Sequence, residues 1–164
     1  MIDFFSYAEA VPVQKEFAIH DDQNQQPVFL EHVGDSEKQV IVISNNSSDY
    51  NFIPVDHKIT LKREDGSDDN VCDAMLYTSN SLCFIEIKSQ RADWIAKASE
   101  QVISTITHFD NNHPNDSHKH REAYLCNWKR RYNLVDTSHK QLKNDFWQNY
   151  RTHLYISNTV KELV

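Results

Sequence analysis

Glycine is scarce in this sequence, with 2 residues in 164, and the scarcity excludes several kinds of binding site. Loops that cradle phosphate need several positions without a Cβ atom, so P-loop and Rossmann dinucleotide sites are not expected. The G-x-S-x-G pattern of a nucleophile elbow is also absent, which argues against serine hydrolase chemistry.

Long hydrophobic runs and paired cysteines are missing as well. No stretch approaches the roughly 18 consecutive apolar residues that cross a bilayer. The first residues, MIDFFSYAEAV, are acidic where a secretory signal would be basic, so we expect a cytoplasmic protein without a membrane partner. The cysteines are odd in number and lack C-x-x-C spacing, which indicates buried, reduced thiols at Cys72, Cys83 and Cys126.

The composition is that of a folded protein, and the length suits a single domain over residues 1–164. Apolar residues make up 39%, and the net charge is −7. That charge is uneven: residues 1–100 carry 8 Lys and Arg against 18 Asp and Glu, whereas residues 101–164 carry 9 against 6. A surface that binds phosphate in the last third is therefore compatible with the acidic total, and the acidic pairs at 21–22 and 64–69 are expected to be solvated turns.

The order of apolar patterns predicts an α/β fold with a mixed central sheet flanked by helices. A short helix is expected within residues 2–17, broken at Pro12. Apolar residues recur at helical spacing over 92–109, and a second helix is expected around 138–150. Strands are predicted at 27–33, 39–44, 58–62, 71–78, 81–88, 123–127 and 153–157.

The pair of strands at 71–78 and 81–88 carries the most informative residues. If its turn centres on Ser79 and Asn80, residues that face each other across the hairpin have numbers that add up to 159. Asp73 then lies opposite Glu86 on one face of the sheet, with Cβ atoms about 4.5 to 5.5 Å apart. Lys88 points to the same face because side chains alternate along a strand.

Two carboxylates that meet in a covered sheet are costly to desolvate unless a cation compensates them. Mg²⁺ or Mn²⁺ prefers such oxygen ligands, and one or two carboxylates suffice because these ions keep several waters. A bound cation lowers the pKa of a coordinated water, while a nearby lysine can orient that water or help to deprotonate it. This combination predicts metal-assisted hydrolysis of phosphodiesters.

At Asp73, Glu86, Ile87 and Lys88 the sequence resembles the PD-(D/E)XK nuclease superfamily, whose fold is restriction-endonuclease-like. The resemblance implies a nuclease that acts on nucleic acid, DNA more than RNA. It implies that Asp73, Glu86 and the main-chain carbonyl of Ile87 bind the metal, while Lys88 lies beside the attacking water. The sequence departs from the family pattern at Cys72, where the name calls for proline.

The resemblance extends more loosely to neighbouring segments. Members often place a Gln on the following helix, for which Gln101 is the candidate. Many also use a Glu from the first helix, for which Glu9 is the better candidate and Glu16 the weaker.

Other residues suggest partners. The run of Lys129, Arg130 and Arg131 lies between Trp128 and Tyr132, so its cations can neutralise phosphates while the rings stack on bases; an exposed turn with docked aromatics explains it equally well. The small size suggests a homodimer or a larger complex.

Two alternatives to a nuclease remain open. One is a noncatalytic domain of the same fold that binds nucleic acid or protein, and the other is an acidic inhibitor that imitates nucleic acid. Four histidines within thirteen residues could hold zinc, contact substrate or lie in a solvated loop: His108, His113, His118 and His120.

Overall fold

The computed structural model describes residues 1–11, 16–22, 24–31, 39–43, 49–90, 92–129, 139–161 and 163. Its central element is a mixed six-stranded sheet with the strand order β1-β5-β6-β7-β8-β9. The bounds of its strands are Glu9–Ala10, Asn51–Pro54, Ala74–Tyr77, Ser81–Lys88, His120–Asn127 and His153–Ile156, in that order. Strands β7, β8 and β9 are parallel, and the other neighbours in this sheet are antiparallel.

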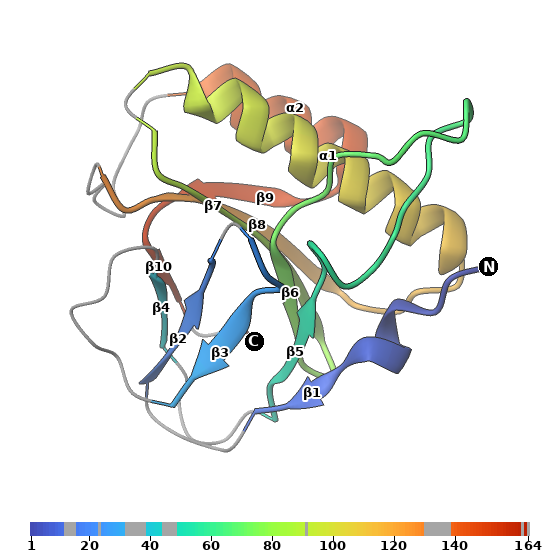
Figure 1. Cartoon of the computed structure of the whole chain (residues 1–164). Helices are drawn as coiled ribbons and strands as arrows, with labels where there is room; N and C mark the ends of the chain where they lie inside the picture. Colours follow the sequence, from blue (N-terminus) through green and yellow to red (C-terminus); the bar gives the residue numbers. More distant parts are fainter. Residues whose placement is uncertain are drawn as a thin grey trace.

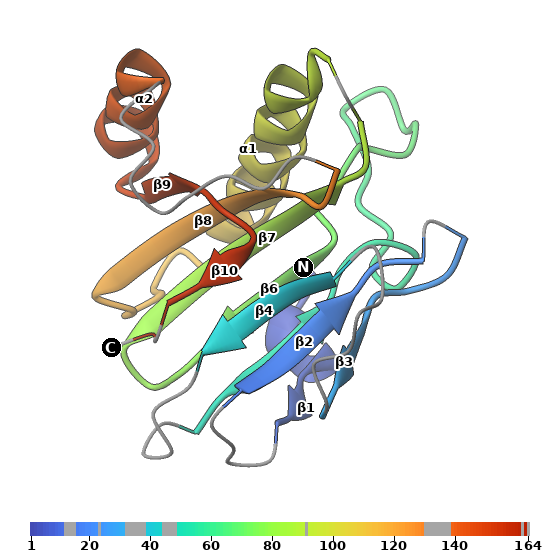
Figure 2. The same ribbon diagram turned by 90° about the vertical axis from the view of Figure 1, so that its left-hand side faces the viewer.

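A second sheet has four strands in the order β10-β4-β2-β3. Its strands are β10 (Thr159–Val160), β4 (Gln39–Ile43), β2 (Glu16–His20) and β3 (Val28–Leu30). Two helices, α1 (Trp94–Asn112) and α2 (Lys140–Tyr150), pack on the opposite face of the central sheet. Figure 2 shows the resulting three layers, with both helices on one side of the central sheet and the second sheet on the other.

The alternation of side chains along the central strands creates two separate cores. Met75 and Phe84 face the helices, where they join Ala98, Val102 and Phe109 of α1. Leu76 and Cys83, one residue further along, face the second sheet with Phe17, Ile19 and Val42. A strand buried on both faces needs an unbroken apolar sequence, which explains the run Leu82-Cys83-Phe84-Ile85 in β7.

The prediction of an α/β fold with a mixed sheet flanked by helices is confirmed (Figure 1). The predicted hairpin register is also confirmed, because Ala74 pairs with Ile85 and Tyr77 pairs with Leu82. The amide of Thr78 donates to the carbonyl of Ser81 at 2.9 Å, so the turn has two residues, Ser79 and Asn80. Both predicted helices and the strands β8 and β9 are present, with bounds shifted by a few residues.

Two local predictions were wrong. The short helix expected within residues 2–17 is only a single 3₁₀ turn, η1 (Phe4–Tyr7), and strands β1 and β2 follow it in the same range. Residues 58–62 form a loop in which Ile59 and Leu61 are buried, and β5 supplies the strand instead. Ile59 and Leu61 therefore fill the core from an irregular segment and not from a strand. Pro12 lies outside the described residues.

All three cysteines are buried and free, as predicted. Among the described residues, no helix combines the length and the apolar character that crossing a bilayer would take.

Candidate functional site

The hairpin of β6 and β7 brings the predicted acidic residues together on the helix-facing side of the central sheet. Asp73 directly precedes β6, and Glu86 and Lys88 lie on β7. Glu86 follows Phe84 at a spacing of two, so it points toward α1 as Phe84 does. The site therefore lies at the end of β7, beneath the helix that follows it.

Asp73 and Glu86 are joined by two main-chain hydrogen bonds. The amide of Asp73 donates to Oε2 of Glu86 at 3.1 Å. The amide of Ile87 donates to Oδ2 of Asp73 at 2.6 Å. The Asp73 carboxylate is thereby held by β7, and the Glu86 carboxylate is held by the amide of Asp73. These bonds keep the two carboxylates close together.

Lys88 completes the site on the side of α1. Its Nζ atom forms an ion pair with Oε1 of Glu86 and donates a hydrogen bond to Oε1 of Gln101. The Gln101 side chain is itself anchored, because its Nε2 atom donates to the carbonyl of Val71 at 2.9 Å. Gln101, predicted from the family resemblance, thus contacts Lys88 directly and orients its ammonium group.

Thr105, one turn further along α1, supports the same segment. Its Oγ1 atom accepts the amide of Cys72 at 2.8 Å and donates to the carbonyl of Gln101 at 3.0 Å. Two consecutive turns of α1 therefore hold the chain just before Asp73. Burial raises the pKa of the Cys72 thiol, which keeps this thiol protonated and unreactive at the position where the family name calls for proline.

The two carboxyl groups are nearly inaccessible to water. Asp73 is 5% exposed and Glu86 is 0% exposed. Burial, then the negative charges of Glu86 and Asp21, raise the pKa of Asp73 well above its usual value. Burial raises the pKa of Glu86 to about 7, against the opposing effect of the Lys88 ammonium. Protons or a cation are thus attracted to this site at neutral pH.

Asp21 is a member of this acidic site that the sequence interpretation missed. It follows β2 and is 4% exposed, so its assignment to a solvated turn was wrong. Its negative charge raises the pKa of both Asp73 and Glu86, so it acts on the site electrostatically. The sequence places this acid shortly after the apolar residues 17–19, which was a hint of its burial. The packing of the second sheet on the central sheet, however, leaves no pattern in the local sequence.

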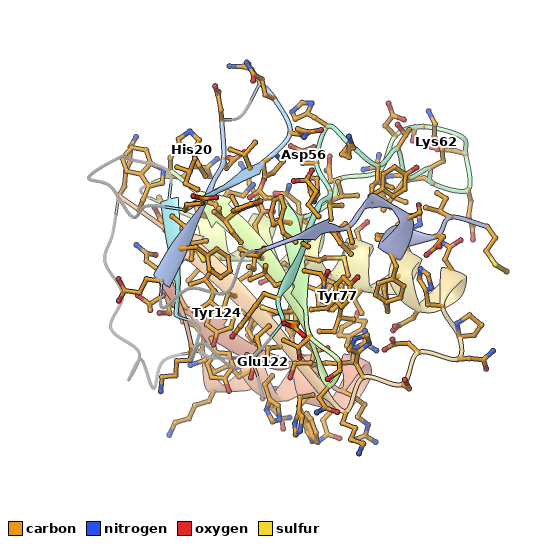
Figure 3. All side chains as sticks on the ribbon, turned by 90° about the horizontal axis from the view of Figure 1, so that it is seen from below. His20, Asp56, Lys62, Tyr77, Glu122 and Tyr124 are labelled. Atoms are coloured by element: carbon orange, nitrogen blue, oxygen red, sulfur yellow. The ribbon has the colours of Figure 1, made fainter. Side chains whose placement is uncertain are left out.

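The main chain that follows β5 also lies beside the site, whereas the Asp56 carboxylate pairs with His57 at 3.3 Å. The amides of Val55 and Asp56 both donate to the carbonyl of Asp73, at 2.9 and 3.2 Å. Figure 3 places Asp56 and His20, the residue before Asp21, at the same end of the molecule, while Glu122 lies toward the opposite end. The chain just after β5 is thus tied by its main chain to the residue that carries the first carboxylate of the site.

The structure does not bring Glu9 and Glu16 to a first helix. Glu9 lies on the edge strand β1, where it is exposed and pairs with Phe52, and Glu16 lies exposed at the start of β2. The correction follows from the single 3₁₀ turn at the start of the chain, which is too short to carry either residue toward Asp73.

The basic run begins next to the site. The amide of Trp128 donates to the carbonyl of Lys88 at 3.3 Å, and Nζ of the exposed Lys129 lies 5.6 Å from the centre of the Trp128 ring. Arg130 and Arg131, also predicted to bind nucleic acid, lie outside the described residues.

The histidines of the 108–120 segment have separate partners. His108 contacts Asp69 at 3.0 Å, and Nδ1 of His118 contacts Asp116 at 2.6 Å. His113 accepts the amide of Phe4 at 3.1 Å. The side chains of His113 and His118 are 15% and 11% exposed, so they pack into the structure, which contradicts the solvated-loop interpretation for these two.

The residues of the site fit a divalent cation by their chemistry. Asp73 and Glu86 offer hard oxygen donors, and their burial beside Asp21 concentrates negative charge that a cation would compensate. Within the described part of the chain, no three His, Cys, Asp or Glu side chains are close enough to form a complete metal cage by themselves. Waters and substrate oxygens would have to supply the remaining ligands, as is usual for Mg²⁺.

No protein-family model, curated protein or solved structure matches this chain. The interpretation of the site therefore depends on its residues and their geometry.

Proposed function

We propose that this protein is a divalent-metal-dependent nuclease with a restriction-endonuclease-like fold, which hydrolyses phosphodiester bonds in nucleic acid, in DNA more than in RNA. The observation that carries the proposal is the meeting of Asp73, Glu86 and Lys88 at the end of one hairpin, in the register expected from the sequence. The mixed sheet, the helix after β7 and the Gln101 contact to Lys88 agree with it.

Each residue has a distinct role in this proposal. Asp73, Glu86 and the carbonyl of Ile87 would hold Mg²⁺ or Mn²⁺, which supplies charge stabilisation for the phosphate and a coordinated water of lowered pKa. Lys88 orients the attacking water, and Gln101 holds the Lys88 ammonium toward it. Lys129, which follows β8, binds the phosphate backbone together with Arg130 and Arg131, the next residues in the sequence.

The alternative is a noncatalytic domain that binds nucleic acid or protein. The complete burial of Glu86 and its ion pair with Lys88 favour it, because a lysine that neutralises a carboxylate inside a core also satisfies a purely structural role. The two functions differ in their response to divalent cations.

The deciding experiment incubates labelled single- and double-stranded DNA and RNA with the protein and Mg²⁺ or Mn²⁺. We expect cleavage by wild type and a loss of at least about 100-fold in Lys88→Ala, because removal of one group that acts only in the transition state costs this much. Lys119→Ala is the matched control, since Lys119 is exposed beside the distant β6–β7 turn. Full activity in Lys88→Ala would exclude the proposed mechanism.

A further inference from the structure

Asn127, the last residue of β8, is a fully buried amide directly opposite Lys88 in the sheet register. It contacts neither carboxylate of the site. A buried amide without hydrogen-bond partners destabilises a protein by about 1 to 3 kcal/mol. The partners of the Asn127 amide are therefore held firmly in place, and they show which chain segments this residue positions.

The Asn127 side chain bonds to the main chain of two different segments. Its Nδ2 atom donates to the carbonyl of Gln90 at 2.6 Å, in the segment that leaves β7. Its Oδ1 atom accepts the amide of Lys129 at 3.1 Å, in the turn that leaves β8. One side chain therefore links the exit of the strand that carries Lys88 to the first residue of the basic run.

The main chain of Asn127 is held in turn by Asn158, between β9 and β10. The amide of Asn127 donates to Oδ1 of Asn158, and Nδ2 of Asn158 donates to the carbonyl of Asn127, both at 2.9 Å. This reciprocal pair extends the contact between the two chain segments beyond Ile156, the last residue of β9. Asn127 thus joins three chain segments at the end of the sheet where the site lies, namely those of Gln90, Lys129 and Asn158.

The same turn contacts the main chain of Lys88. The amide of Trp128 donates to the Lys88 carbonyl, and the Lys129 ammonium lies over the Trp128 ring. The turn is therefore held at Trp128 by Lys88 and at Lys129 by Asn127. These two bonds set the direction in which the Lys129 side chain leaves the sheet. A cation in a fixed position binds a phosphate at a lower entropic cost than one on a mobile loop.

We propose that Asn127 is a positioning residue that couples the lysine of the cleavage centre to a phosphate-binding turn at Trp128 and Lys129. The ligand that this turn would bind is the polyanionic backbone of a nucleic acid. The proposal rests on the proposed function for the identity of the ligand, whereas the link between the turn and Lys88 can be measured independently.

The test compares Asn127→Leu, Lys129→Ala and the double variant. Leucine has the same γ-branched shape as asparagine but carries no polar group, so it removes the bonds to Gln90 and Lys129 without a change in net charge. Asn112→Leu is the matched control, because the Asn112 amide also makes two main-chain bonds, at the far end of α1. Binding of labelled DNA is measured by anisotropy in Ca²⁺ over a range of salt, and amide exchange is measured at 128–129.

We expect Asn127→Leu to lose exchange protection at 128–129 and to bind DNA roughly three- to tenfold more weakly, with a smaller salt dependence. The double variant should bind no more weakly than Lys129→Ala, because both changes remove the same phosphate contact. In the cleavage reaction the KM of Asn127→Leu should rise by a similar factor. Asn112→Leu should leave affinity and exchange at 128–129 unchanged.

Additive losses in the double variant, or full affinity in a folded Asn127→Leu, would overturn the inference while leaving the nuclease function intact. If Asn127→Leu fails to fold, Asn158→Ala gives the same test, since it releases the main chain of Asn127. A wild-type protein that shows the expected coupling in DNA binding but never cleaves would instead overturn the nuclease and retain the inference. Wild type that bound no nucleic acid would overturn both.

Discussion

The main chain of Asp73 donates a hydrogen bond to the carboxylate of Glu86, while the carboxylate of Asp73 accepts one from the residue after Glu86. This exchange places two acids side by side in a region with almost no solvent. Such an arrangement destabilises the fold unless protons or a cation compensate the negative charge of the two carboxylates.

Stability should depend on pH through Glu86. Because its pKa in the folded state is about 7 and its ordinary value is 4.5, the folded protein holds this proton more tightly, and stability falls as pH rises between these values. Relative to Glu86→Gln, wild type should lose roughly 1 to 3 kcal/mol of unfolding free energy from pH 4.5 to 8. Urea denaturation at several pH values measures this difference.

The exposed residue Glu100 supplies the control for that experiment. Glu100→Gln should show no such pH-dependent difference from wild type. The free energy of unfolding of wild type could instead rise with pH relative to that of Glu86→Gln. That result would contradict the assignment of Glu86 as a buried acid of raised pKa.

Divalent cations should stabilise the protein at the same site. A ligand that binds only the folded state at 100 times its dissociation constant adds about 2.7 kcal/mol, which corresponds to several degrees in Tm. Mg²⁺ or Mn²⁺ should therefore raise the Tm of wild type at pH 8, and Asp73→Asn should abolish the gain. A chelator should reverse it in thermal melts, and the absence of any shift in wild type would favour the noncatalytic alternative.

Thr105 should matter through its hydroxyl rather than its size. In Thr105→Val the amide of Cys72 loses its buried acceptor, which should cost about 1 to 3 kcal/mol and displace the segment that carries Asp73. Thr105→Ser retains the oxygen and should restore most of the metal-dependent gain in Tm. Equal behaviour of the two variants in melts with and without Mn²⁺ would show that the hydrogen bond does not position the site.

The aromatic core beneath η1 should be a major source of stability. Phe109 is 0% exposed and packs against Phe4, Phe5 and Phe84, so Phe109→Ala should cost about 3 to 5 kcal/mol. Trp147 stacks on His153 at the surface and is 39% exposed, so Trp147→Ala should cost much less. Urea titrations of both variants compare the two contributions, and equal costs would contradict the assignment of the core.

The hairpin could be predicted from the sequence because its register depends on local features. A two-residue turn at Ser79 and Asn80 fixes every pair along β6 and β7, and the alternation of apolar residues fixes the face. Gln101 was a candidate because the family resemblance implies a Gln on the helix that follows, and the helical spacing put Gln101 on the polar side of that helix. These relationships span a few residues or one turn, so patterns in the sequence were sufficient.

The second sheet could not be predicted in the same way. Asp21 is buried because β2 packs against the far face of the central sheet, which is a contact between segments distant in sequence, and its charge acts on the site from there. Glu9 was misplaced because apolar spacing in a short segment fits a helix and an edge strand alike. Ile59 and Leu61 alternate like strand residues although they are buried in a loop, because burial alone produces the same pattern.

The parallel pairing of β10 with β4 has a consequence for synthesis of the protein. Val42 finds its partner in Val160, so the four-stranded layer cannot be completed until nearly the whole described chain has emerged from the ribosome. Until then the apolar face of Ile85 and Ile87 lacks the part of its cover that Val160 and Leu163 supply.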